Sequence, residues 1–299
     1  MSAAAPAVAA PNRRAGAGGT ARRAAEAALF LGLGLYFAVP MIAVLLYSLA
    51  TRWTAEVLPE AYTLTWWQST LADPEILAAF QTTLVLATLT AAVDVALVVP
   101  AAYWARVRNP RIRPLVETSA AIPFALPYLV IGFALLQFSG IVAPGLQGTF
   151  PLVVLGHCAI AFPFVYWAVD GSMAAAGIER LSEAGETCGA PPWQIIRRIV
   201  FPNITPGIVS GSLLAFATSF GEFALTQMVG RGIYTIPIWS ASAIRSYSGE
   251  SGDFNRLAVV TMISFFVLFV LSAIVVYFNR GQVARLLPGA GTVDKREQP

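Results

Sequence analysis

Six long apolar runs dominate this sequence and limit what it can fold into. The lipid core of a membrane holds no water, so a chain that crosses it must satisfy its backbone hydrogen bonds within a helix of about 20 residues. By that criterion the runs predict transmembrane helices at about 27–50, 77–103, 115–139, 150–170, 204–229 and 257–279. Only 12% of the 299 residues are charged, against about a quarter in soluble domains. We therefore expect an all-α, polytopic membrane protein with six transmembrane helices.

The basic residues predict the orientation of these helices. With the N-terminus inside the cell, fifteen of the nineteen lysines and arginines lie on the cytoplasmic side. The four on the outer side are Arg52, Arg231, Arg245 and Arg256. Because cytoplasmic loops are enriched in Lys and Arg, we expect a multi-pass protein of the plasma or inner membrane with both termini in the cytoplasm. The segment 171–203 then becomes a cytoplasmic loop.

Composition divides the chain into three parts. Residues 1–25 are rich in Ala, Gly, Pro and Arg, which predicts a disordered basic tail. Residues 26–280 form the transmembrane domain, and residues 281–299 form a cytoplasmic C-terminal tail. An alternative interpretation makes the first apolar run a secretory signal that ends at the sequence SLA, residues 48–50. That run is longer than the apolar region of a typical signal, about 7–15 residues, so we favour a transmembrane helix.

The stretch LSEAGETCGAPPWQIIRRIVFPNITP, residues 181–206, is too polar to lie in a bilayer. Its pattern predicts a first short helix over 178–188, which ends where Gly189 supplies a left-handed turn. Pro191 and Pro192 fit the first turn of a second short helix, and we expect Pro202 to stop it. The result is a compact helix-turn-helix outside the membrane, with small residues that let another surface come close.

This stretch resembles the EAA loop of the permeases of ATP-binding cassette (ABC) importers, the MetI-like membrane subunits of binding-protein-dependent uptake systems. The family pattern is Glu-Ala-Ala, three residues, Gly, nine residues, Ile, one residue, Leu-Pro. The matching positions here are Glu183, Ala184, Gly189, Ile199 and Pro202. Gly185 replaces the second alanine and Phe201 replaces the leucine. The loop precedes the penultimate predicted helix, so the resemblance extends to most of the chain, and an amphipathic hairpin without a partner is the alternative that we disfavour.

The resemblance implies a coupling helix, the part of such a permease that docks into a separate cytoplasmic ATPase. It further implies two ATPase subunits, a second permease subunit that is identical or paralogous, and an extracytoplasmic solute-binding protein. Alternating access, driven by ATP in the partner, would then move a small solute inward. The only lysine of the chain is Lys295, so it carries no phosphate-binding loop of the Gly-x-x-x-x-Gly-Lys-Ser/Thr type. We expect no enzymatic activity in this chain, no cofactor and no nucleic-acid partner.

The substrate class is predicted less sharply. The segment SFGEFALTQMVGRGIYTIPIWSASAIRS, residues 219–246, resembles permeases for polyamines, ferric iron, thiamine, aminoethylphosphonate, and sulfate or molybdate more than sugar permeases. Two other classes compete with an ABC permease. An ion-coupled secondary transporter fits the membrane carboxylates but not the lack of a repeat. An intramembrane hydrolase lacks both a Gly-x-Ser-x-Gly elbow and a paired histidine.

Four polar residues inside predicted helices are candidates for the translocation pathway: Glu222, Asp94, Gln137 and Gln227. An ionisable group in hydrocarbon costs at least about 2.5–3.5 kcal/mol, so it normally faces a cavity or a partner. We hypothesise that Glu222 faces an aqueous cavity near the interface of two permease subunits and assists a polar or cationic solute. For Asp94, hydrogen bonds to a neighbouring helix or to a second subunit are an equal alternative.

Several other residues receive structural interpretations. We expect Glu117 and Asp170 to be solvated charges at helix ends, and His157 to be packed and hydrogen-bonded with no metal bound. Pro123 and Pro127 should bend the third transmembrane helix. A stripe of small residues in the fifth predicts close contact with another helix; its members are Gly207, Gly211 and Ala215.

Overall fold

The computed structural model describes residues 17–53, 57–245 and 252–286, and within these the chain is helical. Two strand-like residues, Ala50 and Tyr62, form an isolated antiparallel bridge. The helices, in chain order, are α1 (Ala17–Leu49), α2 (Thr65–Leu71), α3 (Pro74–Tyr103), η1 (Trp104–Arg108), η2 (Pro110–Ile112), α4 (Arg113–Ala125), α5 (Tyr128–Val142), η3 (Pro144–Leu146), α6 (Phe150–Ala176), α7 (Ile178–Thr187), α8 (Pro192–Ile195), η4 (Ile196–Val200), α9 (Phe201–Gly221), α10 (Ala224–Val229), α11 (Ile236–Arg245) and α12 (Gly252–Leu286).

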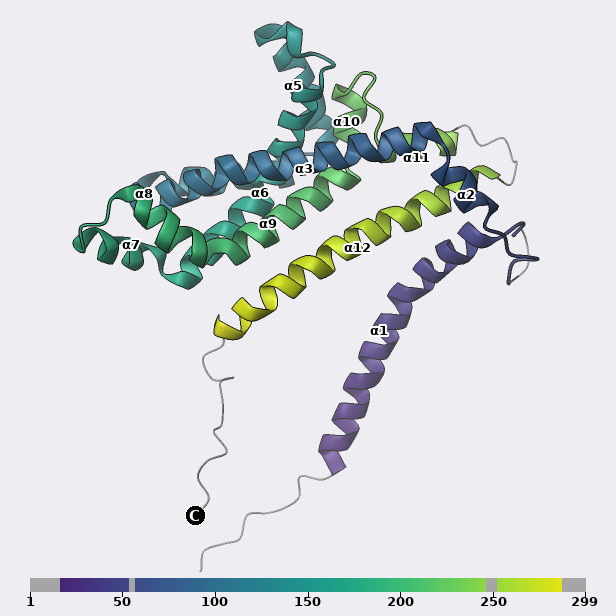
Figure 1. The fold of residues 1–299 in the computed structure, drawn as a ribbon, viewed down its shortest axis with the longest axis horizontal. Helices are drawn as coiled ribbons and strands as arrows, with labels where there is room; N and C mark the ends of the chain where they lie inside the picture. The colour runs from purple at the N-terminus through teal and green to yellow at the C-terminus, as the bar shows by residue number, and fades with distance from the viewer. Residues whose placement is uncertain (1–16, 54–56, 246–251, 287–299) are drawn as a thin grey trace, which may run out of the picture.

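The centre of the molecule is the packing of α3, α6 and α9, which run alongside one another (Figure 1). The predicted stripe of small residues lies at the contact between α9 and α6, and all three of its members are buried. A Cβ atom added at Gly207 would lie 2.5 Å from the carbonyl oxygen of Ala168 in α6. The prediction of a close helix contact is therefore confirmed, because only the absence of a side chain lets the two backbones approach this far.

The bundle has two distinct ends. In Figure 1 the short helices α7 and α8 lie at one end, and α2 and α11 lie at the other. At the α2 end, Asp73 caps α3 by accepting a hydrogen bond from the backbone amide of Glu75, 2.9 Å away. The same carboxylate pairs with Arg256 of α12. This ion pair links the start of α3 to the start of α12.

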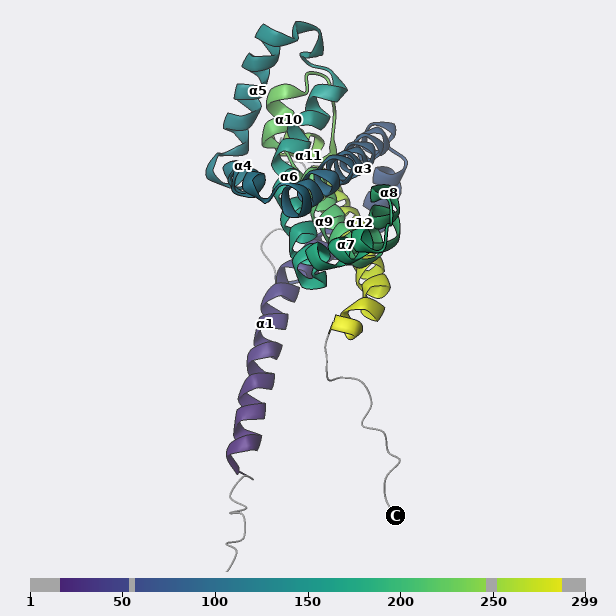
Figure 2. The ribbon, with the colours of Figure 1, turned by 90° about the vertical axis from the view of Figure 1, so that its left-hand side faces the viewer.

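Helix α1 extends away from the rest of the chain, as Figure 2 shows. It contacts α12 and α2, and its apolar side chains stay exposed, with Phe30 73% and Leu31 76% accessible. By length and composition, five helices of the described chain could cross a membrane, and α4 and α5 together could supply a sixth. The prediction of an all-helical polytopic membrane protein is thus confirmed.

The third and fifth predicted transmembrane helices are not continuous, which corrects the sequence prediction. The run 115–139 breaks into α4 and α5, which meet at an angle of 110°. Leu126 and Pro127 are extended at the break, with ψ of 135° and 138°. Pro127 thus lies at a break between two helices instead of bending one, whereas Pro123 lies inside α4. The run 204–229 breaks after Gly221, where Glu222 has a ψ of 128°. Helices α5 and α10, which follow the two breaks, pack against each other.

Two further boundaries differ from the prediction. Helix α1 begins at Ala17, so residues 17–25 of the predicted basic tail are helical, whereas residues 1–16 lie outside the described residues. Residues 281–286 of the predicted C-terminal tail belong to α12, and 287–299 lie outside the described residues. Pro202 does not stop a helix. It lies in the first turn of α9, directly after the π-helical segment η4, where a missing backbone N–H is tolerated.

Candidate functional site

The predicted helix-turn-helix is present and lies at one end of the bundle. Helix α7 ends in a left-handed turn at Gly189, whose φ is +79°. The amide of Ala190 donates to the carbonyl of Gly185 at 3.0 Å, and the amide of Gly189 donates to that of Glu186 at 2.8 Å. This pair of bonds is the Schellman arrangement, which requires a left-handed residue that glycine adopts without strain. Helix α8 then begins with Pro192 in its first turn, as predicted.

The loop has an outward and an inward side. Glu183, Ala184 and Gly189 are exposed, whereas Gly185 is buried and Ile199 is half-buried. The three exposed positions form the part of the motif that another protein can reach. Pro202 is also exposed and lies at the start of α9.

The inward side explains why glycine replaces alanine at position 185. A Cβ atom on Gly185 would lie 3.0 Å from Cδ1 of Ile199 and 3.2 Å from Cγ1 of Ile195. These distances are shorter than ordinary van der Waals contacts. The two isoleucines therefore occupy the space that an alanine side chain would need, and they pack α7 against the segment that leads into α9.

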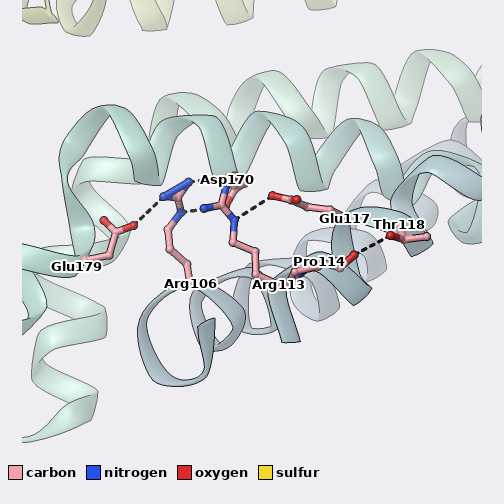
Figure 3. Close-up of polar contacts among 7 residues, drawn as sticks. All are labelled: Arg106, Arg113, Pro114, Glu117, Thr118, Asp170 and Glu179. Atoms are coloured by element: carbon pink, nitrogen blue, oxygen red, sulfur yellow. Dashed lines mark hydrogen bonds and ion pairs between the residues drawn. The ribbon is translucent and has the colours of Figure 1, made fainter. Parts of the chain in front are cut away.

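A cluster of buried and half-buried charges lies beside the loop (Figure 3). Arg106 of η1 is 7% exposed and donates to both oxygens of Asp170 in α6, at 2.8 and 3.0 Å. Its remaining nitrogen donates to Glu179 of α7 at 2.7 Å. Arg113 of α4 donates to Asp170 at 3.2 Å and pairs with Glu117 at 2.9 Å. We call these five residues the ion-pair cluster; it joins η1, α4, α6 and α7.

The cluster corrects one prediction. Asp170 is not a solvated charge at a helix end, because its side chain is 14% exposed and two arginines contact it. Glu117 is half-exposed but also paired with an arginine. Sequence reasoning missed the cluster because Arg106 and Asp170 lie 64 positions apart. The available signal was that opposite charges lie at the ends of the second and fourth apolar runs, on the same predicted side of the membrane.

A second ion pair connects the far part of α7 to η1. Arg108 lies 2.7 Å from Glu186, and both side chains are partly exposed. Both π-helical segments of the described chain, η1 and η4, contact α7. Such widened turns occur frequently at functional sites.

The hypothesis that Glu222 faces an aqueous cavity is wrong for this structure. Its side chain is 2% exposed and lies within its own subunit. The carboxylate accepts hydrogen bonds from the backbone amides of Leu225 at 2.8 Å and Thr226 at 2.9 Å, and from the hydroxyl of Thr226 at 3.0 Å. Glu222 thus satisfies the amides that the break between α9 and α10 leaves without helical partners.

His157 supports the same break from α6. Its ring is fully buried, as predicted, and forms hydrogen bonds of 2.7 Å with the hydroxyls of Ser219 and Thr226. Its Nε2 lies 3.7 Å from Glu222. A polar network within the membrane region therefore connects α6 to both sides of the break.

The other three pathway candidates lie outside this network, and they do not line a common cavity among the described residues. Asp94 is 2% exposed and packs within the α3, α6 and α9 core. Its Oδ2 has no hydrogen-bond partner among the described residues, so the alternative of hydrogen bonds to a neighbouring helix or a second subunit stays a prediction. Gln137 of α5 and Gln227 of α10 are exposed. Among the described residues, three surface cavities of about 510–630 Å³ are lined by other side chains, one of them by Trp104, Arg108 and Phe201 beside the helix-turn-helix.

Comparison with known proteins identifies the family. The family described as "Binding-protein-dependent transport system inner membrane component" matches residues 98–283, which is more than half of the chain. The chain belongs to this family. The permease is 32% identical over 168 residues to the molybdenum transport system permease protein ModB of Azotobacter vinelandii, a match that covers 52% of this chain and 74% of ModB. It is 29% identical over 216 residues to the sulfate transport system permease protein CysW of Escherichia coli K12, covering 68% and 74%.

Two solved structures share the fold of the permease. A bacterial ABC transporter involved in the import of the acidic polysaccharide alginate superposes with a TM-score of 0.66 at 15% identity, over 85% of this chain and 95% of that one. The inward-facing MetNI methionine ABC transporter superposes with a TM-score of 0.54 at 19% identity, over 69% and 97%. At such identities the likeness shows the fold alone.

Family membership decides between the functional classes that the sequence left open. The chain is the multi-pass inner-membrane permease subunit of a binding-protein-dependent ABC importer, and neither an ion-coupled secondary transporter nor an intramembrane hydrolase. ATP hydrolysis occurs in a partner subunit, and a binding protein delivers the solute. Residues 178–203 lie within the matched region.

Proposed function

We propose that this permease imports a tetrahedral oxyanion of the molybdate and sulfate class. The similarity to permeases named for molybdenum and sulfate transport carries the proposal. The burial of Glu222 and Asp94 supports it. The hypothesis that Glu222 assists a polar or cationic solute required its carboxylate to contact the solute. The side chains of Glu222 and Asp94 are both enclosed by protein in this structure, so neither provides such a contact.

The transport unit of this proposal contains two permease subunits, identical or paralogous, and two ATPase subunits. The long exposed apolar surface of α1 is available to lipid or to a helix of the second membrane subunit. Both termini lie in the cytoplasm in this arrangement. The C-terminal end of α1, at Leu49, and the N-terminal end of α12 meet at α2, which lies on the outer side in this arrangement. The opposite ends of the two helices therefore point away from the outer side.

In this proposal residues 178–203 form a coupling loop, and its exposed side docks on the ATPase. Glu183 and Ala184 supply the contact surface, and Gly189 holds the turn between α7 and α8. The exposed carboxylate of Glu183 can accept a hydrogen bond from a cationic or amide donor of the ATPase. The inward residues Gly185 and Ile199 transmit the position of α7 to the start of α9.

Uptake by the reconstituted complex tests the substrate. Proteoliposomes that contain the permease, its ATPase and its binding protein are expected to accumulate radiolabelled molybdate or sulfate with ATP, and not spermidine. ATP-dependent accumulation of spermidine, or of neither oxyanion, would contradict the proposed substrate class.

The two cysteines of the chain allow a direct test of docking. Cys188 is exposed next to Gly189, whereas Cys158 is buried in α6, so a maleimide reagent labels Cys188 selectively. We expect the ATPase to protect Cys188 from labelling. Gly189→Asp should reduce both this protection and co-purification of the ATPase, since a φ of +79° strains an L-residue by about 1–2 kcal/mol. Equal labelling of Cys188 with and without the ATPase would contradict a docking role of the loop.

A further inference from the structure

We propose that Arg106, Asp170 and Glu179 form a joint that sets the angle of α7 against the transmembrane helices. The joint keeps ATP hydrolysis coupled to movement of the bent pair α4 and α5. The inference rests on the docking role of the loop in the proposed function. It assigns positioning roles to residues outside the EAA-type motif.

The backbone alone does not fix the direction of α7. Helix α6 ends at Ala176 and α7 begins at Ile178, so Gly177 alone lies between them. Gly177 is left-handed, with a φ of +62°, and an added Cβ would meet no atom within 4 Å. A single permissive residue therefore connects a transmembrane helix to the docking helix, and side-chain contacts must determine the angle between them.

Charge pairing supplies one of these contacts. The guanidinium of Arg106 is 7% exposed and is shared between Asp170 of α6 and Glu179 of α7. A change in the angle of α7 would pull Glu179 away and leave part of a buried cation unpaired. Buried charges that lose a partner are strongly unfavourable, so the joint resists small rotations and releases only when the loop is driven.

The ion-pair cluster also connects α7 to the bent pair of helices, α4 and α5. Arg113 contacts the same carboxylate as Arg106, at 3.2 Å, and begins α4. Arg113 also pairs with Glu117 one turn later in α4. Figure 3 shows these groups in one continuous row from α7 to α4. Because α4 is the first half of the broken pair, movement of α7 reaches α4 through three ion pairs, and a fourth lies within α4.

The second pair, Arg108 with Glu186, acts near the other end of α7. Its two side chains are 32% and 43% exposed, so a charge reversal at either position leaves no buried ion. Two separate ionic contacts along one short helix fix its direction, whereas one contact would leave it free to pivot.

The geometric test uses spin labels at two exposed positions of the full-length permease. One is the native Cys188; the other is introduced by Leu115→Cys in α4, where the leucine is 69% exposed. We expect a single narrow distance distribution, which Glu179→Gln should broaden. The matched control is Glu26→Gln, which removes the carboxylate of an exposed arginine pair in α1. It should leave the distribution unchanged.

The functional test measures ATP hydrolysis by the reconstituted complex with and without the loaded binding protein. The ratio of the two rates is the stimulation of ATP hydrolysis by the binding protein. We expect Glu179→Gln to reduce this stimulation about fivefold or more, while co-purification of the ATPase is retained. Arg108→Glu and Glu186→Arg should each reduce it as well, and the double swap should restore it. The control Glu26→Gln should behave as the wild type.

The two tests separate this inference from the proposed function. A narrow distribution in Glu179→Gln, with stimulation unchanged, would overturn the joint even if the complex transports an oxyanion. A double swap that behaves like its two single variants would overturn the role of the second pair. The spin-label distances need neither the ATPase nor the solute, so an error in the proposed substrate would not affect them.

Discussion

Replacing Gly207 by alanine should weaken the contact between α9 and α6 that holds the centre of the permease together. The added Cβ would lie 2.5 Å from the carbonyl oxygen of Ala168 and 2.5 Å from Cβ of Ser172. Both distances are far below van der Waals contact, and one obstacle is backbone, which cannot rotate away. Such overpacking costs about 1–3 kcal/mol, and the upper part of that range applies here. Alanine regains about 1 kcal/mol of helix propensity, which leaves a net loss of about 2 kcal/mol.

Gly171→Ala in α6 is the matched control. No atom lies within 4 Å of a Cβ added at Gly171, so only the helix propensity changes, and stability should rise by about 1 kcal/mol. The two alanine variants are thus expected to shift stability in opposite directions. At about 2–4 °C per kcal/mol for a chain of this size, Gly207→Ala should melt about 4–8 °C lower than the wild type.

The assay is the fraction of purified permease that stays monodisperse in detergent after heating, measured by size-exclusion chromatography over a temperature series. Gly207→Ala with a midpoint at or above that of the wild type would refute the close contact. A fall of the same size in Gly171→Ala would instead point to a general sensitivity of these helices to alanine.

Two further predictions concern buried and capping carboxylates. Glu222→Ala leaves the amides of Leu225 and Thr226 without acceptors and should lower stability by about 1–3 kcal/mol, measured by the same heating assay; a variant as stable as the wild type would show that water replaces the cap. Burial raises the pKa of Asp73, but the hydrogen bonds from Arg256, Glu75 and Ile76 outweigh it and hold the pKa below its ordinary value of 3.8. The stabilisation by this carboxylate is therefore fully present above its unfolded pKa and is lost as the pH falls through the lowered folded value. The midpoint difference between wild type and Asp73→Asn should accordingly be largest at pH about 7 and should shrink progressively as the pH falls below 3.8; a difference independent of pH would contradict the ionic role.

Much of the fold could be predicted from the sequence, because the decisive properties are local. A run of about 20 apolar residues becomes a helix in a bilayer wherever its neighbours lie. The positions of α3, α6 and the membrane-spanning part of α12 follow from such runs. The stripe that contains Gly207 follows from spacing within one helix. Local spacing also located the turn at Gly189, since a left-handed residue between two short helices is a property of a few successive residues.

The breaks in the third and fifth runs could be predicted only in part. Pro123 and Pro127 indicated a bend, but not that α5 would leave α4 at 110° and pack on α10. At Glu222 the local pattern was misleading, because a carboxylate in an apolar run suggests that the side chain faces a water-filled cavity. Its acceptors are instead used by the two amides that the break exposes.

By itself, then, the sequence determined the membrane class, most of the helical runs, the helix-turn-helix and the family resemblance, since each depends on residues close together in the chain. The tertiary structure alone decided the partners of the charges. Arg106 meets Asp170 across 64 positions and Glu179 across 73. The contact of His157 with Thr226 spans 69 positions. The energy of a buried charge or polar group depends on the group that lies within hydrogen-bond distance, and which group that is follows from the packing of α3, α6 and α9.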